Sequence, residues 1–350
     1  MAIALITDQH LNSRKGSEIF WEYFMKFYNN VFFPNLEKYK VKTIIDLGDT
    51  FDNRKTIDFC DLNKIKKYYY DVLKSMNITI HMIVGNHTSY YKNTNKVNTP
   101  ELLLDSYDNI LVYSEIQDVI IEDTCITLIP WINSENYDHV MKHISNTNAK
   151  IAMGHLEING FIAHPGHVFE GGINSNIFSK YEKVFSGHFH HKSQKENIVY
   201  LGNPYEIYWN DYNEQRGFHL FDSATHKIKF FQNPYKIFKK IFYNDNHTNY
   251  LLLDINEYKD TYVKIIVEYK KDFYNFDKFL ERLYDIGVHE IKIVEDNNLN
   301  YETDNIEDNA EIIDTLTILS NYIEDMNTHF NKSDLKDLVK SVYIEAYEIT

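Results

Sequence analysis

Short apolar runs recur through the first two thirds of the chain, and most end at a polar residue or a glycine. Such runs predict buried strands. They occur at 3–7, 43–47, 78–84, 110–113, 125–129, 150–153, 184–186, 199–201 and 218–221. Helical spacing of apolar residues appears at 18–31, 61–75, 137–145 and 173–181. This α/β pattern has more strands than one six-stranded sheet needs, so we expect two packed sheets with helices outside, a four-layer α/β/β/α sandwich.

The same pattern divides the chain into four parts. The sandwich accounts for residues 1–222. Residues 223–295 read as a small α+β domain with an extended, a helical and a second extended segment, which we expect to form a cap. Residues 296–309 are polar, acidic and without period, as in a linker. Residues 310–350 hold two amphipathic helices, each with an apolar stripe that must be buried against something.

The net charge of −15 argues at first against a nucleic-acid substrate. However, residues 295–350 carry 14 acidic residues against three lysines, a charge of −11 that leaves −4 for residues 1–294. Two bound divalent ions would neutralise the first part. Cys60 and Cys125 do not indicate a disulfide framework, and no apolar stretch is long enough to span a membrane, so we expect a cytoplasmic protein.

Residues that bind metal ions follow several of the predicted strands. The motifs are Asp8-x-His10, Gly48-Asp49, Gly85-Asn86-His87, Gly154-His155 and Gly187-His188-x-His190. Each is common by chance when taken alone. Their joint occurrence in order at strand ends is not, because the ends of neighbouring strands can meet at one edge of a sheet. The order therefore predicts one site.

Counting charges supports a site for two metal ions. The proposed ligands are Asp8, His10, Asp49, Asn86, His155, His188 and His190. They supply two negative charges against +4 from two divalent ions, so an anionic substrate is favoured. Mixed imidazole and oxygen ligands suit manganese, iron or zinc better than magnesium or calcium. Paired ions about 3.5–4 Å apart can activate water and stabilise a leaving oxygen.

These motifs resemble those of the calcineurin-like metallophosphoesterases, and within them the SbcD-type recombination nucleases, including phage-encoded subunits. The segments 154–161 (GHLEINGF), 129–131 (IPW) and 200–204 (YLGNP) extend the resemblance, which covers residues 1 to about 222 in order. It implies two divalent ions, with Mn²⁺ the expected metal. The first would be held by Asp8, His10, Asp49 and His190, and the second by Asp49, Asn86, His155 and His188.

The resemblance also assigns catalytic roles. His87 would donate a proton to the leaving oxygen or stabilise charge on the phosphate, and Asp52 would support it. Arg54 is a candidate phosphate or DNA contact, although an exposed salt bridge fits equally well. Thr88 is a departure, because the family has an acidic residue there. Trp131 and the remaining histidines are interpreted as core or surface residues.

The resulting hypothesis is a two-metal DNA exonuclease and endonuclease subunit of an SbcCD-like complex for recombination and double-strand break repair. The small domain at 223–295 would cap the site on its DNA side. The resemblance implies a homodimer whose C-terminal helices dock on an SbcC-type coiled-coil ATPase, in the host cytoplasm if the gene belongs to a phage. The alternative for the helices is that they fold back on their own domain. The alternatives for function are a DNA-end tethering scaffold with vestigial catalysis and a phosphoesterase for small substrates.

Overall fold

The computed structural model describes residues 2–164, 167–295, 323, 332 and 335–336. The contacts between residues divide the chain into two compact units, Met1–Asn297 and Asn298–Thr350. The predicted acidic linker and nearly all of the predicted C-terminal helices lie outside the described residues. Within the described part of the chain, no helix has the length and apolar character needed to cross a membrane.

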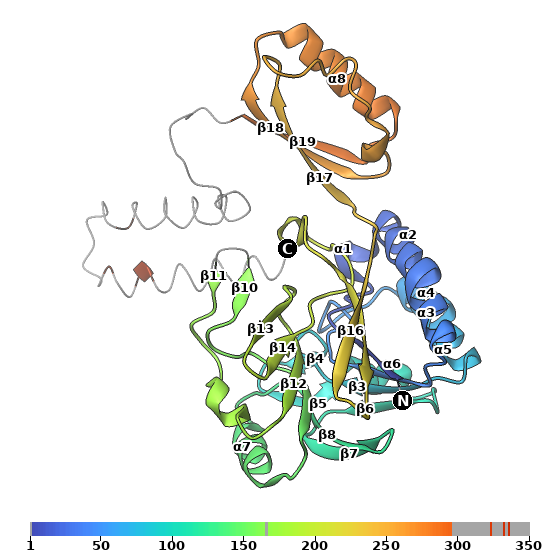
Figure 1. Cartoon of the computed structure of the whole chain (residues 1–350), viewed down its shortest axis with the longest axis vertical. Helices are drawn as coiled ribbons and strands as arrows, with labels where there is room; N and C mark the ends of the chain where they lie inside the picture. Colours follow the sequence, from blue (N-terminus) through green and yellow to red (C-terminus); the bar gives the residue numbers. More distant parts are fainter. Residues whose placement is uncertain (1, 165–166, 296–322, 324–331, 333–334, 337–350) are drawn as a thin grey trace. The chain divides into compact units, whose positions relative to one another are not determined.

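Two six-stranded sheets form the body of the first unit (Figure 1). The first sheet has the order β16-β15-β1-β2-β3-β6. Its strands are β1 (Ala2–Ile6), β2 (Thr43–Asp46), β3 (Thr79–Ile83), β6 (Ile110–Tyr113), β15 (Gly217–Asp222) and β16 (Lys227–Gln232). The four strands β1, β2, β3 and β6 are parallel, while β15 and β16 run antiparallel to their neighbours.

The second sheet has the order β13-β14-β12-β9-β8-β7. Its strands are β7 (Gln117–Ile121), β8 (Thr124–Ile129), β9 (Ile151–His155), β12 (Lys183–Gly187), β13 (Ser193–Lys195) and β14 (Ile198–Tyr200). The central strands are parallel and both edge strands are antiparallel. Two hairpins stand apart from the sheets, β4 (Ser89–Tyr91) with β5 (Thr94–Asn98), and β10 (Ile162–His164) with β11 (His167–Val168).

Alternation along each strand separates three apolar cores. In β1, Ile3 and Leu5 face the space between the sheets, whereas Ala4 and Ile6 face the helices. The inter-sheet core also takes Leu128 and Phe185 from the second sheet. The outer face of that sheet packs on its own helices in a third core. The predicted four-layer α/β/β/α sandwich is therefore confirmed.

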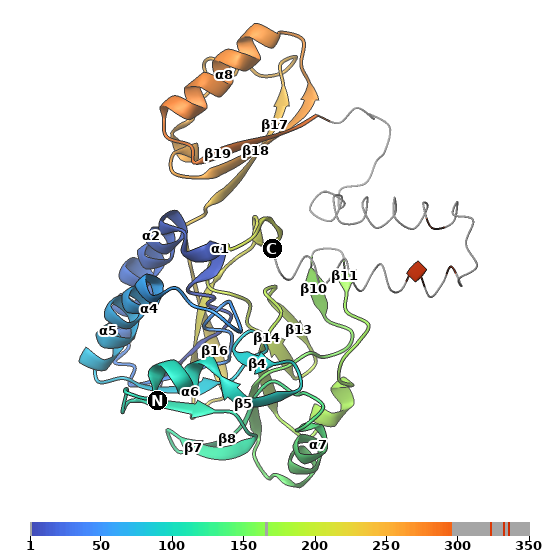
Figure 2. The same cartoon turned by 180° about the vertical axis from the view of Figure 1, so that it is seen from behind.

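The helices flank the two sheets on opposite sides (Figures 1 and 2). They are α1 (Ser13–Gly16), α2 (Glu18–Phe27), α3 (Phe33–Lys38), α4 (Phe59–Ile65), α5 (Asp71–Ser75), α6 (Thr99–Leu104) and α7 (Tyr137–Asn146), with short 3₁₀ turns at Ser175–Phe178 and Trp209–Asp211. One π turn, Tyr28–Phe32, joins α2 to α3, and another, Lys66–Tyr70, joins α4 to α5. The helical periods predicted at 18–31 and 61–75 thus continue through π turns.

The helix predicted at 173–181 is wrong. Only the 3₁₀ turn Ser175–Phe178 forms, and the segment before it is extended, because the amide of Ile173 donates to the carbonyl of Glu157 at 2.9 Å. Phe178 and Tyr181 are buried in the outer core of the second sheet. Their spacing, which reads as a helical stripe, comes instead from a turn that leads directly into β12.

The small α+β domain consists of β17 (Phe238–Asn244), β18 (Tyr262–Tyr269), α8 (Phe273–Asp285) and β19 (Glu290–Glu295), with a 3₁₀ turn at Asn256–Tyr258. Its three strands are parallel in the order β17-β18-β19, and α8 packs on them around Phe279. β16 pairs with β15, so the first sheet extends ten residues beyond the predicted boundary at 222. The Glu206 carboxylate, which accepts from the amides of Ile237 and Phe238 at 2.9 and 3.0 Å, anchors the connection.

His81 gives the fold a measurable sensitivity to acid. It lies buried in β3 with Nδ1 2.7 Å from the Tyr113 hydroxyl, and burial lowers its pKa from 6.5 to about 4. The unfolded chain therefore binds a proton below about pH 6.5 that the folded chain refuses until about pH 4. We expect His81→Gln to reduce the loss of unfolding free energy between about pH 7.5 and 5 by about 2 kcal/mol, measured by urea denaturation. If His81→Gln lost as much unfolding free energy between these two pH values as wild type does, this assignment would be contradicted.

Candidate metal centre

Five turns at the carboxyl ends of parallel strands meet between the two sheets. Asp8, Asp49 and Asn86 follow β1, β2 and β3 of the first sheet, while His155 ends β9 and His188 follows β12 of the second. The turns are joined directly, because the amide of Asp8 donates to the carbonyl of Gly48 at 2.9 Å. The carboxyl edge of parallel strands is where such folds place their sites.

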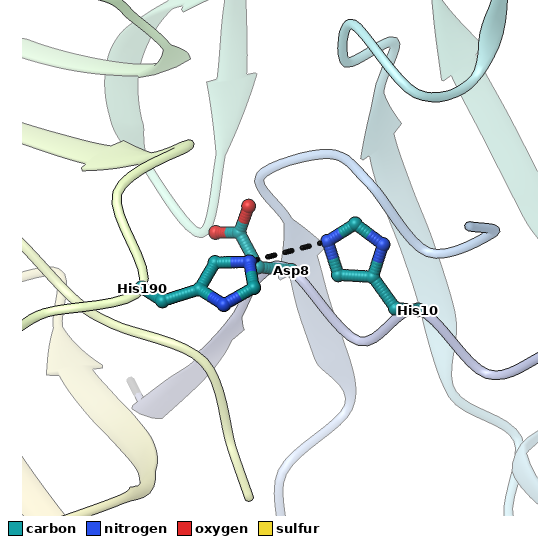
Figure 3. Close-up of side chains that lie close together, drawn as sticks. All are labelled: Asp8, His10 and His190. Atoms are coloured by element: carbon teal, nitrogen blue, oxygen red, sulfur yellow. Dashed lines mark hydrogen bonds between the residues drawn. The ribbon is translucent and has the colours of Figure 1, made fainter. Parts of the chain in front are cut away.

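The first group of ligands consists of Asp8, His10 and His190, whose donor atoms lie within 4.8 Å of one another (Figure 3). The two rings point toward each other, with His10 Nε2 and His190 Nε2 3.3 Å apart. The Asp8 carboxylate beside them is oriented by the Thr7 hydroxyl at 2.7 Å and by the amide of His188 at 3.0 Å. Two facing imidazole nitrogens and a carboxylate form an arrangement that fits a cation.

The second group consists of Asp49, Asn86, His155 and His188. His155 Nε2 lies 3.1 Å from Asp49 Oδ2 and 2.8 Å from Asn86 Oδ1, and His188 Nδ1 lies 3.1 Å from the same amide oxygen. Asp49, His155 and Asn86 are buried, whereas His188 keeps 17% of its side chain exposed. A buried cluster of groups that all offer lone pairs is stable only around protons or a cation.

The outer nitrogen of every proposed histidine ligand is near an oxygen. His155 Nδ1 meets the carbonyl of Leu47 at 2.8 Å, and His10 Nδ1 meets Asp52 Oδ1 at 2.9 Å. His190 Nδ1 is 3.4 Å from Asp211 Oδ1, and His188 Nε2 is 3.6 Å from Glu157 Oε1. Metal-binding histidines are typically held in this way, with the other ring nitrogen directed at the ion. The residues present therefore fit divalent ions.

The predicted catalytic pair adopts an arrangement that the sequence did not specify. His87 Nδ1 is 2.8 Å from the backbone oxygen of Asp52, whereas the Asp52 carboxylate contacts His10 instead. The His87 ring stands edge-on to the His10 ring with centroids 5.0 Å apart. Asp52 thus orients one ligand and one catalytic candidate at once. Arg54 is half-buried in the turn that follows.

The electrostatics of the site are dominated by its carboxylates. Burial disfavours a charge on His10, but Asp52 and the other aspartates raise its pKa to about 9. Burial also disfavours a charge on His155, but the interaction with the Asp49 carboxylate is stronger and raises the pKa of His155 to about 9. Burial alone would raise the pKa of Asp49, yet His155 and the other imidazoles hold it well below its usual range. For His87 burial prevails and lowers its pKa. The site therefore attracts positive charge.

Backbone strain is concentrated in the same turns. Asp8, His10, Asp49 and His188 have φ values of 49°, 43°, 54° and 85°, in the left-handed region that non-glycine residues rarely adopt. Such strain persists only where the surroundings fix the conformation, and it is typical of functional sites. Four of the seven proposed ligands are held in this way.

Several residues around the site were not predicted from the sequence. Asp211 is buried, contacts His190 and pairs with Arg216 Nη2 at 3.2 Å. Arg216 also donates to the carbonyl of His190 and to the side chain of Asn203. Isolated Asp and Arg residues that follow no strand motif carry no signal of their own in a single sequence. Trp131, predicted to be core, lies half-buried against His188 with ring centroids 5.2 Å apart.

Thr88, which departs from the family pattern, has a structural role. Its buried hydroxyl accepts from the amide of Gly85 at 2.9 Å and donates to the carbonyl of Gly85 at 3.0 Å. It therefore closes the turn that presents Asn86 and His87. An acidic residue is not needed to shape this turn.

Gly85 allows the turn to approach Asp49. A Cβ added at Gly85 would lie 2.1 Å from Asp49 Oδ1 and 2.7 Å from Asp49 N, closer than atoms can come. We expect Gly85→Ala to displace Asp49 and to weaken Mn²⁺ binding by roughly 10- to 100-fold, measured by calorimetry. Gly287→Ala is the control, because nothing lies within 4 Å of its added Cβ and only its φ of +90° is strained. Equal Mn²⁺ affinity in the two variants would contradict the expectation.

Comparison with known proteins identifies the family. The model of the calcineurin-like phosphoesterase family matches residues 1–192. The chain is also 30% identical over 316 residues to exonuclease subunit 1 of Enterobacteria phage T4, with 89% of each chain covered. The chain therefore belongs to the calcineurin-like phosphoesterase family and is a metal-dependent phosphoesterase, which confirms the resemblance of its motifs.

Two solved structures with some similarity are named as a nuclease and as a dimetal phosphatase. A nuclease MPE from Pseudomonas putida is 14% identical, with 66% of this chain and 87% of the other covered and a TM-score of 0.31. A dimetal phosphatase from Danio rerio is 10% identical, with 63% and 91% covered and a TM-score of 0.39. These scores are low, so the family assignment rests on the two sequence comparisons.

Proposed function

We propose that this chain is a two-metal DNA nuclease, the phosphodiesterase subunit of a recombination and repair complex. The observation that carries the proposal is the pair of ligand groups at the strand ends, one around His10 and His190 and one around His155 and Asn86. The T4 relative, named as an exonuclease subunit, supports DNA as the substrate and a partner chain.

The two groups would hold two divalent ions, Mn²⁺ in our proposal, with Asp49 shared between them. Such ions would supply a nucleophile from water and neutralise charge on the phosphodiester. The chain's own groups supply the remainder. His87 donates Nδ1–H to the carbonyl of Asp52, so in the neutral ring that its lowered pKa favours, Nε2 carries a lone pair. Nε2 would take up a proton when the negative charge of a bound phosphodiester raises that pKa, and would then deliver it to the leaving oxygen. The amide of His87, bonded to Asp49 Oδ1 at 2.9 Å, ties this histidine to the proposed shared ligand.

Partners belong to the same proposal. We infer that the small domain, predicted at 223–295, caps the DNA side of the site and contributes to DNA binding. We also infer that residues 310–350 dock on an SbcC-type coiled-coil ATPase in a homodimeric assembly within the host cytoplasm. The T4 relative is called a subunit, which agrees with a multi-chain enzyme. The apolar stripes of the C-terminal segment are the sequence feature that favours docking.

A direct assay separates the proposal from its rivals. Purified protein is incubated with a panel of Mn²⁺, Mg²⁺, Zn²⁺ and EDTA, with duplex DNA, single-stranded DNA or a small phosphomonoester, and with or without the candidate ATPase. We expect DNA hydrolysis that depends on Mn²⁺ and is abolished by EDTA. Efficient hydrolysis of the phosphomonoester with none of DNA would replace the proposal by the small-substrate alternative.

A DNA-tethering scaffold is the other alternative, and Thr88 is the feature that prompted it. The turn-closing bonds of Thr88 and the ordered ligand groups both weigh against vestigial catalysis. A scaffold would bind DNA in a gel-shift assay yet show the same trace of hydrolysis in wild type and in a His87→Ala variant.

A further inference from the structure

A cavity of about 210 Å³ opens beside the second ligand group. Its lining consists of Trp131, Ile132, Tyr137, Glu157, Gly172 and Ile173. Two of these residues also contact a proposed ligand, since Trp131 lies against the His188 ring and Glu157 Oε1 is 3.6 Å from His188 Nε2. Pockets for drug-sized ligands start at about 300 Å³, so this one suits a single ring system.

We propose that this cavity receives the nucleobase of a nucleotide flanking the scissile phosphate. The base stacks on Trp131 and Tyr137, and Glu157 accepts a hydrogen bond from its amino group. This inference rests on the proposed nuclease function and specifies how that function selects its substrate. It makes Trp131 a residue that binds substrate, where the sequence had indicated only a core tryptophan.

The chemistry of the walls selects a base rather than a phosphate. Glu157 presents a carboxylate that keeps 35% of its side chain exposed, and this charge repels a phosphodiester. The same carboxylate accepts from an exocyclic amino group, as acidic side chains do from cytosine N4. Trp131 and Tyr137 offer aromatic faces, on which every base stacks. The phosphate is thereby directed to the neighbouring ligand groups.

The wall that carries Trp131 is held firmly by its backbone. The amide of Trp131 donates to the carbonyl of Val84 at 2.8 Å. Its own carbonyl accepts from the side chains of Asn95 and Asn136 at 2.8 and 3.0 Å. Val84 immediately precedes the turn that presents Asn86 and His87, so the position of the tryptophan is coupled to that of the site.

The part of the lining formed by Glu157, Gly172 and Ile173 is held together by backbone hydrogen bonds between two segments. The amide of Ile173 donates to the carbonyl of Glu157 at 2.9 Å, and the amide of Asn159 donates back to Ile173 at 3.0 Å. Gly172 has a φ of +71°, and a Cβ there would lie 2.3 Å from the carbonyl oxygen of Glu157. The glycine thus lets the two segments close together, and the cavity is formed before any substrate arrives.

The test uses a single-stranded oligonucleotide with one cleavable phosphodiester between resistant methylphosphonate linkages. We expect Trp131→Ala to raise KM about tenfold, within the range found for one base stacked on one aromatic ring. A second substrate carries an abasic site in place of the base that enters the cavity. On this substrate the KM values of wild type and Trp131→Ala should agree within about twofold, because no stacking remains to be lost. The abasic site is placed on the 5′ side of the cleavable linkage in one substrate and on the 3′ side in another.

Two further variants keep the test decisive. Tyr137→Ala changes a residue that is 48% exposed, so it serves if the tryptophan variant does not fold. Phe59→Ala removes an 85% exposed ring at the start of α4 and should leave KM unchanged. An equal rise in KM on normal and abasic substrates would overturn the stacking role, because the loss would then not involve the base.

The contact with Glu157 is tested from the substrate side, since Glu157 also touches His188. Replacing adenine by unsubstituted purine removes the amino group, and we expect KM to rise about fivefold in wild type. Equal KM values would overturn the Glu157 contact. If wild type with Mn²⁺ cleaves none of these oligonucleotides, the nuclease proposal itself fails, which is a different result from cleavage that ignores the base.

Discussion

Replacing Asp49 with asparagine is expected to lower the rate of Mn²⁺-dependent DNA hydrolysis by roughly 10³-fold or more. Losing a residue that only hydrogen-bonds to a metal ligand typically costs about 10- to 100-fold, and Asp49 is proposed to bind the ions directly. Asp49 is buried, its Oδ2 meets His155 at 3.1 Å and its Oδ1 accepts the amide of His87. Asparagine keeps the size but removes the charge that both proposed ions would share. The measurement is initial rate together with metal content by mass spectrometry.

Asp108→Asn provides the matched control, because that carboxylate is 82% exposed and pairs with Lys74 on the surface. It should keep both activity and metal content. Should Asp49→Asn retain two ions per chain and wild-type rates, Asp49 would not be the shared ligand and the arrangement of the two groups would have to be reinterpreted.

His87→Gln is expected to reduce kcat by about 10²- to 10⁴-fold while leaving metal content unchanged. His87 is not one of the seven proposed ligands, and its Nδ1 is fixed on the carbonyl of Asp52. Its ring nevertheless lies with His10 and Asp52 in a third group whose donor atoms are within 4.8 Å of one another, so metal content is the measurement that separates the two roles. Glutamine can still donate hydrogen bonds but cannot deliver a proton at neutral pH. Single-turnover rates on duplex DNA, with metal content in parallel, measure the effect.

A His139→Gln variant is the control for general effects of losing a histidine, because His139 lies on α7 near His143, outside the ligand groups. It should cleave DNA as wild type does. Loss of metal from His87→Gln would instead make His87 a ligand, and an unchanged kcat would remove it from catalysis.

The main architecture was predictable because its signals are local. A buried strand such as β1 is an unbroken apolar run, and the residue that follows it, Asp8, stands out against that run. Edge strands gave weaker signals. β7 and β16 are partly exposed and mix polar with apolar residues, so neither formed a run that the sequence could mark.

The surroundings of the site were less predictable, since they depend on contacts between distant segments. The chain separates Arg216 from His190 by 26 residues, and Glu157 from His188 by 31. Nothing in the local sequence says that Asp211 will orient a histidine or that Trp131 will border a cavity. Asp52 shows the same limit, because its backbone oxygen and its carboxylate turned out to serve different histidines.

The fixed outer nitrogens of the four proposed histidine ligands have a consequence for how the enzyme would acquire its metals. Because the carbonyl of Leu47 and the carboxylates of Asp52, Asp211 and Glu157 already orient the rings, loading an ion needs no refolding of the loops. At a site of imidazole and carboxylate ligands, intrinsic affinity rises from manganese through iron towards zinc, so binding of Mn²⁺ depends on which ions are available as well as on ligand geometry. The supply of manganese, iron and zinc would then help to decide which ions a given molecule carries.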